Sequence, residues 1–158
     1  MLSRAEWDRL LKSGSDVDLI GVFSELPEDN MIGFVLYADG EICNGGFFQY
    51  YSNGIFSARE HIHHLQQLGL NQLADVVQQT LNLFPDSVQP VRLESDLVPI
   101  DDRILQLLGD RSCLDNLNID YFEVNGTNSK GPTLVEVACA KHIRDHADEY
   151  WDLLEAGY

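Results

Sequence analysis

The strongest structural signal in this chain is Glu41-Ile42-Cys43-Asn44-Gly45-Gly46-Phe47-Phe48-Gln49-Tyr50-Tyr51-Ser52-Asn53. It combines four aromatic residues with two adjacent glycines and four side chains that end in a carboxylate or an amide. Paired glycines let a backbone turn sharply or approach a neighbouring element closely, while aromatic side chains bury a large apolar area. We therefore interpret this stretch as the nucleus of the fold, with its amides buried beside the glycines.

The same stretch resembles the motif of a known family. Members of the bacterial DNA-mimic protein family, formerly a domain of unknown function, carry Glu-x-x-Asn-Gly-Gly-Phe-x-Gln-aromatic-aromatic-x-Asn. Here the motif residues are Glu41, Asn44, Gly45, Gly46, Phe47, Gln49 and Asn53. Further matches extend the resemblance over roughly Glu6 to Trp151, namely Leu68-Gly69, Ala74, Phe84-Pro85, Leu117, Asp120-Tyr121, Lys141-His142-Ile143 and His146. The resemblance implies an interaction protein that occupies the DNA-binding face of a basic DNA-binding protein or transcription regulator.

Acidic residues dominate the charge and are concentrated toward the two ends of the chain. Ten lysines and arginines stand against 26 aspartates and glutamates, which gives a formal net charge of −16. Residues 1–41 contribute −6, residues 42–93 contribute −1 and residues 94–158 contribute −9. Such a field repels nucleic acid and attracts basic proteins. We expect a basic protein partner and no direct binding of DNA or RNA.

Length and composition predict one domain over residues 1–158. The 158 residues are 44% hydrophobic, which supplies an ordinary core. The three cysteines, Cys43, Cys113 and Cys139, form no Cys-x-x-Cys pair, so we expect neither disulfides nor a thiolate metal site. The amino terminus carries charged residues where a signal peptide needs an apolar stretch, and no run of apolar residues is long enough to span a membrane. These features favour a cytoplasmic protein without a cofactor, and homodimerisation stays open.

Helical periodicity covers most of the chain and predicts an all-α, multi-helix bundle. A continuous apolar run, Met31 to Tyr37, interrupts the amphipathic pattern, and a buried strand is the alternative there. Residues 86–99 have the composition of a loop. The expected helices cover Arg4 to Lys12, Pro27 to Gly40, Ala58 to Leu68, Asn71 to Phe84, Asp101 to Leu108, Ser112 to Val124, and a long last helix from Thr133 to Glu155.

The last predicted helix carries five acids at separations of three or four residues, which would line one exposed face. Like charges at that spacing cost about 0.2–0.5 kcal/mol per pair, and acids at a helix carboxyl end cost roughly another 0.3–1 kcal/mol each. Folding does not require this row of acids. One interpretation is that it is an ordinary solvated helix face with no binding role. In the mimic hypothesis the row and four neighbouring acids stand in for DNA phosphates. The proposed partner-binding acids are Glu94, Asp96, Asp101, Asp102, Asp145, Asp148, Glu149, Asp152 and Glu155.

The polar residues of the family motif have two interpretations. In one, Glu41, Asn44, Gln49 and Asn53 line a ligand pocket walled by the tyrosines that follow. In the other, these groups satisfy buried backbone groups at a helix junction. We favour the structural role, because no nucleophile and base accompany the cluster. That role predicts that Asn44→Ala or Gly46→Val lowers the melting temperature.

Histidines suggest a metal site that the remaining sequence does not support. His142 and His146 stand one helical turn apart, but Ile143 occupies the position where the hydrolytic zinc motif has a glutamate, and no third ligand can be assigned. We therefore expect no metal ion. His146 is expected to donate a hydrogen bond to a buried partner, and His61 to His64 to form a partly exposed helix face.

Three hypotheses about function remain. The first is the acidic DNA mimic, which needs no catalysis. The second is a cytoplasmic enzyme or small-ligand binder that uses a polar pocket around Glu41 to Asn53. The third is a structural protein whose acidity only maintains solubility. We commit to the first, and we expect the position of the acids on the folded surface to separate the three.

Overall fold

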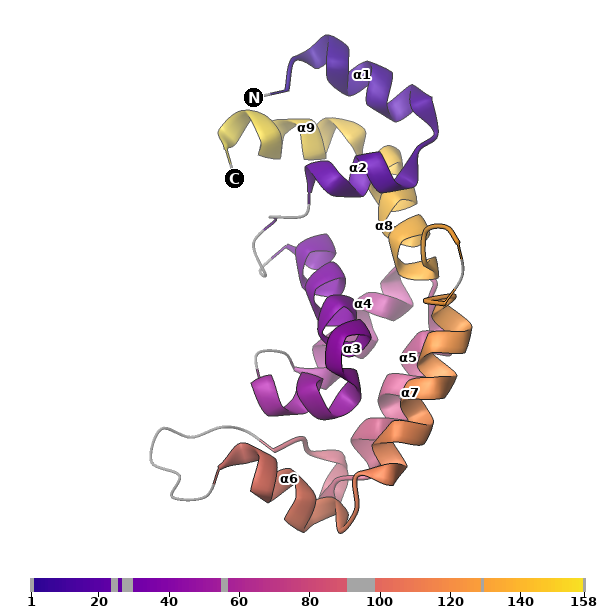
Figure 1. Cartoon of the computed structure of the whole chain (residues 1–158). Coiled ribbons are helices and arrows are strands. Elements are labelled where there is room, and N and C mark those ends of the chain that lie inside the picture. Colours follow the sequence, from indigo (N-terminus) through magenta and orange to yellow (C-terminus); the bar gives the residue numbers. More distant parts are fainter. Residues whose placement is uncertain are drawn as a thin grey trace.

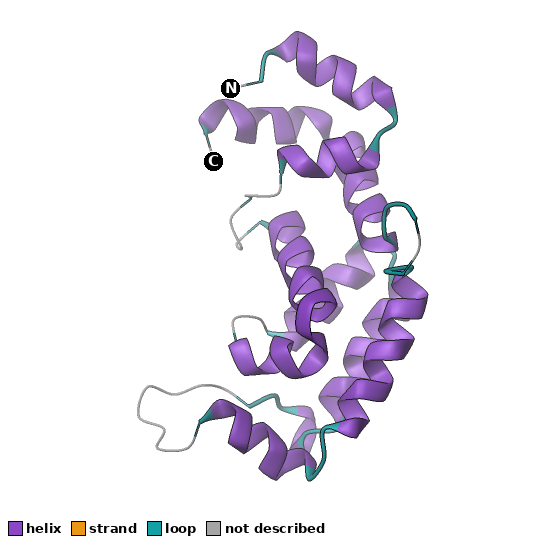
Figure 2. Ribbon diagram, viewed as in Figure 1, coloured by secondary structure: helices purple, strands orange, loops and turns teal. Residues whose placement is uncertain are grey.

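The computed structural model describes residues 2–23, 26, 30–54, 57–90, 99–128 and 130–157. Within these ranges helices alternate with loops and no strand occurs (Figure 2), so the all-α prediction is confirmed. The elements in chain order are α1 (Arg4–Ser13), α2 (Asp16–Val22), α3 (Met31–Asn53), α4 (Ala58–Gln67), α5 (Asn71–Asn82), the 3-10 turn η1 (Pro85–Ser87), α6 (Ile100–Leu108), α7 (Ser112–Asn125), α8 (Leu134–Asp145) and α9 (Ala147–Ala156).

The helices are arranged around α3, which lies in the middle of the molecule (Figure 1). Helix α7 packs on α3 and on α5, and α4 packs on α3 and α5. Helix α8 packs on α2 and α3. Helices α1, α2 and α9 gather at one end and α6 lies at the other, with α7 and α8 running between the two ends (Figure 1).

Helix α3 is central because its first half is apolar on every side. Four consecutive residues, 32–35, are buried, and a helix that is apolar all round belongs in a core. The strand alternative for this run is therefore wrong. Asn30 caps the helix by accepting the N–H of Ile32 (2.9 Å), whereas the predicted start at Pro27 lies outside the described residues. The predicted end at Gly40 is also wrong, since burial of Ala38 and Ile42 carries the helix through the glycine.

A kink at Gly46 divides α3 within the family motif. Gly46 has φ 71° and ψ −173°, a conformation that is almost exclusive to glycine. The kink frees the N–H of Phe47, which donates to Oδ1 of Asn118 on α7 (2.7 Å). The paired glycines therefore produce the sharp turn and the close approach that the sequence suggests, and both bring α3 against α7.

The amino-terminal helices contain one confirmed prediction and one omission. Ser3 and Glu6 form a capping box at the start of α1, and Gly14 ends that helix in the left-handed conformation. Helix α2 was not predicted from the sequence, although Ser15 caps it and its apolar residues follow at helical spacing. Both helices pack through Trp7, which is fully buried and contacts Phe23 edge to face, with ring centroids 5.8 Å apart.

The middle of the chain follows the predicted pattern closely. Ser57 caps α4 by accepting the N–H of Glu60 (3.4 Å), and α5 and α7 begin at the expected residues. Helix α6 differs in one respect, because the helical spacing of Ile104, Leu107 and Leu108 predicts that all three face inward, whereas Leu107 is 40% exposed. The predicted loop begins with η1, and its residues 91–98 lie outside the described part of the chain.

The last predicted helix is in fact two helices. Thr133 caps α8 as expected, but His146 leaves the helical region with φ −120° and ψ 34° and separates α8 from α9. The helical spacing of Val137, Ala140 and Ile143 predicts one buried stripe, but Val137 is 39% exposed. In the described ranges, none of the helices combines the length and apolar character that crossing a lipid bilayer requires.

Candidate interaction surface

The carboxyl-terminal acids are exposed, but they do not form one uninterrupted row. Asp145 lies at the end of α8 and the other four lie on α9, so the break at His146 corrects the prediction of a single helix face. Asp148, Asp152 and Glu155 still share one side of α9, because separations of four and three residues correspond to about one helical turn each. The α9 acids are Asp148, Glu149, Asp152 and Glu155.

Two of the five acids already have cationic partners. Asp145 forms an ion pair with Lys141, and Asp148 accepts a hydrogen bond from Nη2 of Arg4 at 2.9 Å. The guanidinium of Arg4 also lies over the ring of Trp151, 5.2 Å from its centroid. Exposed pairs of this kind contribute little to stability, but they lower the local negative charge. Glu149, Asp152 and Glu155 have no ion pair with any described residue.

The acids of α6 lie far from those of α9. Asp101 and Asp102 are exposed in the first turn of α6, where the positive end of the helix dipole stabilises carboxylates. Figure 1 shows α6 and α9 at opposite ends of the molecule, so the prediction that these acids neighbour the α9 row is wrong. Glu94 and Asp96 lie outside the described residues.

Exposed acids that the sequence reasoning missed lie between the two ends. Helix α7 carries Asp120 and Glu123 at a separation of three residues, and both are exposed. Asp115 is also exposed but pairs with Arg111, whose Nε lies 3.5 Å from its Oδ1. The separation of Asp120 and Glu123 by three residues within a predicted helix was the sequence signal that could have identified these acids. Acids are therefore present on α7 and α8, which line one side of the molecule, and on α6 and α9 at its two ends (Figure 1).

Three polar residues of the family motif hold one another across the kink. Oε2 of Glu41 accepts a hydrogen bond from Nε2 of Gln49 (3.0 Å) and another from Nδ2 of Asn53. Tyr50 and Tyr51, the expected pocket walls, are each 1% exposed and lie in the core. The Tyr51 hydroxyl lies within hydrogen-bond distance of the Thr80 hydroxyl, with the two oxygens 2.7 Å apart.

Asn44 differs from the other motif residues, because it is exposed and makes no hydrogen bond with a described residue. The expectation that it satisfies a buried group is therefore wrong. We now expect Asn44→Ala to change the free energy of unfolding by no more than about 0.5 kcal/mol, as at other surface positions. Thermal unfolding of the variant checks this. A clear loss of stability would show that Asn44 has a structural role, whereas unchanged stability with lost partner capture would make it a binding residue.

A buried carboxyl group joins α3, α7 and α8. Oδ1 of Asp39 accepts hydrogen bonds from the Tyr121 hydroxyl (2.9 Å) and from Nδ2 of Asn125 (2.8 Å). Asn125 in turn accepts the N–H of Val135 at the start of α8 (3.1 Å). Burial raises the pKa of Asp39 to about 6. Burial, and to a smaller extent the nearby Asp39, raises the pKa of the Cys43 thiol to about 11. Cys43 is therefore a thiol at neutral pH, which makes it a poor nucleophile.

The histidines occupy two different environments. The rings of His142 and His146 stack with centroids 4.2 Å apart, and Nδ1 of His146 lies 2.9 Å from the carbonyl oxygen of His142. His146 is exposed, so the expected buried partner is absent and its contact is with its own helix turn. His61 is fully buried, so the expected partly exposed face is wrong for His61 and holds for His63 and His64. Among the described residues, no three His, Cys, Asp or Glu side chains are placed to hold a metal ion.

Comparison with known proteins identifies the family. No curated protein and no solved structure matches the chain. The family model for DMP19-like protein matches residues 24–146, from the end of α2 to the residue between α8 and α9. The match covers well over half of the chain and includes the motif that forms the kink in α3. The chain therefore belongs to the DMP19-like family, which is a family of DNA mimics.

Proposed function

We propose that this protein is a DNA mimic that occupies the DNA-binding face of a basic DNA-binding protein or transcription regulator. The observation that carries the proposal is the series of exposed carboxylates on α6, α7, α8 and α9. Helices α7 and α8 run between α6 and α9, which lie at the two ends of the molecule, and membership of the DMP19-like family supports the same role. The partner would be held by charge, so the protein itself would not bind nucleic acid.

The spacing of the acids on α9 suits this role. Asp148, Asp152 and Glu155 are four and three residues apart, which corresponds to about 6 and 4.5 Å of rise along the helix. Phosphates follow one another every 3.4 Å of rise along one DNA strand, so a helix row supplies somewhat fewer charges per unit length. Acids from other helices must therefore contribute to any surface that imitates a longer segment of DNA.

The family match divides the candidate acids into two groups. It ends at His146, so Asp101, Asp102, Asp120, Glu123 and Asp145 lie inside it and the acids of α9 lie beyond it. A role shared by the family would therefore use the acids of α6, α7 and α8, and α9 would extend the surface in this chain. The two groups lie on different helices and can be tested separately.

The test uses pairs of substitutions with the same change in net charge. D152N/E155Q removes two acids from α9, D101N/D102N removes two from α6, and Q66K/Q79K adds two positive charges at exposed positions elsewhere. Proteins captured from a cell lysate by the unmodified chain are identified, and a gel shift measures how far the chain displaces duplex DNA from them. We expect at least one acid-to-amide pair to weaken displacement by about tenfold, and the lysine control to have little effect.

Two results would contradict the proposal. One is that both acid-to-amide variants displace duplex DNA as well as the lysine control does. Displacement would then not depend on these acids. The other is binding of the unmodified chain to duplex DNA itself. Melting temperatures of all variants, measured in parallel, separate lost contacts from lost folding. Displacement is also expected to weaken as salt rises, since exposed charges are screened over about 8 Å at physiological ionic strength.

A further inference from the structure

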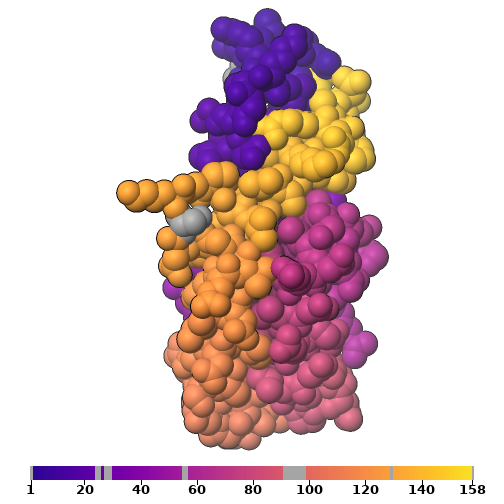
Figure 3. Space-filling model, turned by 90° about the vertical axis from the view of Figure 1, so that its right-hand side faces the viewer, coloured from indigo at the N-terminus to yellow at the C-terminus, as the bar shows by residue number. Residues whose placement is uncertain are grey.

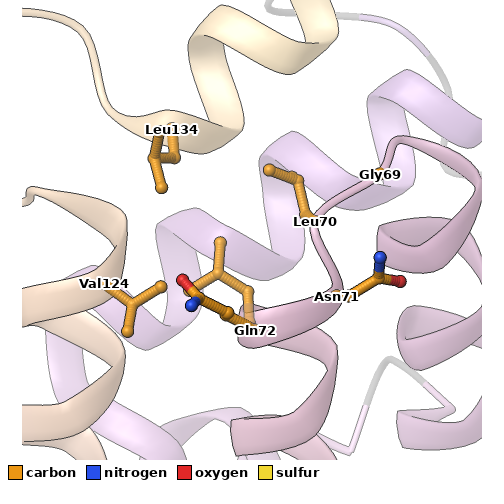
Figure 4. A pocket seen from close by; sticks show the side chains of 7 residues that line it. Gly69, Leu70, Asn71, Gln72, Val124 and Leu134 are labelled. Atoms are coloured by element: carbon orange, nitrogen blue, oxygen red, sulfur yellow. The ribbon is translucent and has the colours of Figure 1, made fainter.

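A half-open hollow lies where the turn between α4 and α5 meets the end of α7 and the start of α8. Its volume is about 350 Å³, and its lining residues are Gly69, Leu70, Asn71, Gln72, Leu73, Val124 and Leu134. Figure 4 shows the side chains of Leu70, Val124 and Leu134 converging on the hollow from three different elements. Figure 3 shows α7 and α8 in orange beside α4 and α5 in magenta, on a face that is open to solvent.

Apolar side chains are held in an exposed position at this site. Leu134 is 45% exposed, and Val137, one turn later on α8, is 39% exposed. Leu134 cannot turn into the core, because its neighbour Val135 is fully buried and donates its N–H to Asn125. Thr133 and Glu136 form a capping box that fixes the same turn of α8. The hollow is thus preorganised, which lowers the entropy lost when a partner binds.

Acidic residues lie close in sequence to the lining residues of the hollow. Within four residues of a lining residue, the chain carries four carboxylates and one ammonium group, and all of these residues are described. Asp75, Asp120 and Glu123 are exposed, while Glu136 also caps Thr133. The ammonium group belongs to Lys130, in the turn between α7 and α8. The charged groups in question are Asp75, Asp120, Glu123, Lys130 and Glu136.

We propose that this hollow binds a basic segment of a protein partner that inserts one or two large apolar side chains between Leu70, Val124 and Leu134. Its cationic residues would face the acids that lie within about one helical turn of the lining residues. Apolar anchors in a pocket with a charged rim are the usual form of a strong protein contact, whereas the carboxylates oppose a nucleic acid here. The inference rests on the proposed function only in taking the partner to be basic, since the hollow lies apart from the acids of α9.

The test measures binding of a labelled synthetic peptide by fluorescence anisotropy. The probe is a leucine–lysine peptide of about four helical turns with all leucines on one face. One control peptide has serine in place of leucine, and the other has glutamate in place of lysine. We expect L134A to weaken binding of the probe by about tenfold, as for a truncated anchor residue. The matched control is V17A, because Val17 is 56% exposed on α2 and lies outside the hollow.

Charge is tested on the same probe with two pairs of substitutions. D120N/E123Q beside the hollow is expected to weaken binding several-fold, and D152N/E155Q on α9 to leave it unchanged. The inference is overturned if L134A binds the probe as V17A does, if the serine–lysine peptide binds equally well, or if the leucine–glutamate peptide does. The gel-shift variants change acids of α6 and α9 only, and L134A changes no acid, so failure of DNA displacement and failure of peptide binding can be told apart.

Discussion

Replacing Gly46 with alanine is expected to destabilise the domain by about 4 kcal/mol. The backbone at Gly46, with φ 71° and ψ −173°, is one that residues with a Cβ atom almost never adopt, and forcing it costs about 1–3 kcal/mol. A Cβ atom would also lie 2.8 Å from Cγ and from Oδ1 of Asn118. Displacing Asn118 strands the N–H of Phe47, and an unsatisfied buried group costs about 1–3 kcal/mol more.

The measurement is thermal unfolding, with Gly40→Ala as the matched control. Gly40 lies in the same helix with open space around its Cα, so alanine there is expected to be neutral or slightly stabilising. At about 3 °C per kcal/mol for a domain of this size, Gly46→Ala should lower the melting temperature by roughly 12 °C. In an Asn118→Ala background the cost of Gly46→Ala should be smaller, because the clash is already removed. Equal melting temperatures for the Gly46 and Gly40 variants would show that the kink is dispensable.

His61→Leu is expected to stabilise the protein, and more strongly in acid. His61 is fully buried among the rings of Phe34 and Tyr50, and neither of its ring nitrogens has a hydrogen-bond partner among the described residues. Burial, and secondarily His64, lowers the pKa of His61 to about 3 from 6.5. Below pH 6.5 His61 is therefore protonated in the unfolded chain but stays neutral in the native state, so the free energy of unfolding falls as the pH drops toward 3. Over that range the loss is on the order of 4 kcal/mol.

Asp39 has the opposite dependence on pH and provides the internal control. Its native pKa of about 6 lies above the ordinary 3.8, so the native state binds a proton first and stability rises as the pH falls between those values. The two effects oppose each other between pH 6 and 3.8. Urea unfolding across that window should show stability rising toward acid in His61→Leu and falling steeply in Asp39→Asn. Identical slopes in the two variants would show that neither group controls acid stability.

The sequence was sufficient for the helices whose ends have chemical markers. Ser3, Ser57 and Thr133 cap helices where they were expected to, and the apolar positions of α5 are buried as a group. It failed where tertiary packing overrides local preference. Gly40 does not end α3, because burial on both sides stabilises the helix through it, and nothing in the sequence around His146 marks the break that separates α8 from α9.

The candidate surface could be predicted only in part, because exposure depends on packing that local sequence does not encode. Acids were correctly expected to be exposed on the last segment, but the separation between α6 and α9 needs the tertiary structure. Asn44 and His61 were placed wrongly for the same reason: one polar side chain reaches solvent and the other is enclosed by aromatic rings. The hollow at Leu134 joins segments about 60 residues apart, which no periodicity reveals.

The packing of α9 against α1 has a consequence for how the domain assembles. Arg4 and Asp148 are 144 residues apart, and Trp7 lies beside Trp151 with ring centroids separated by 6.3 Å. Closing so long a loop is entropically unfavourable until the intervening helices are in place, so we expect these contacts to form late in folding and to open early. Local opening of this kind has a smaller free energy than global unfolding. We therefore expect the order of the α9 carboxylate row to depend on the docking of α1, which makes that row a property of a local equilibrium.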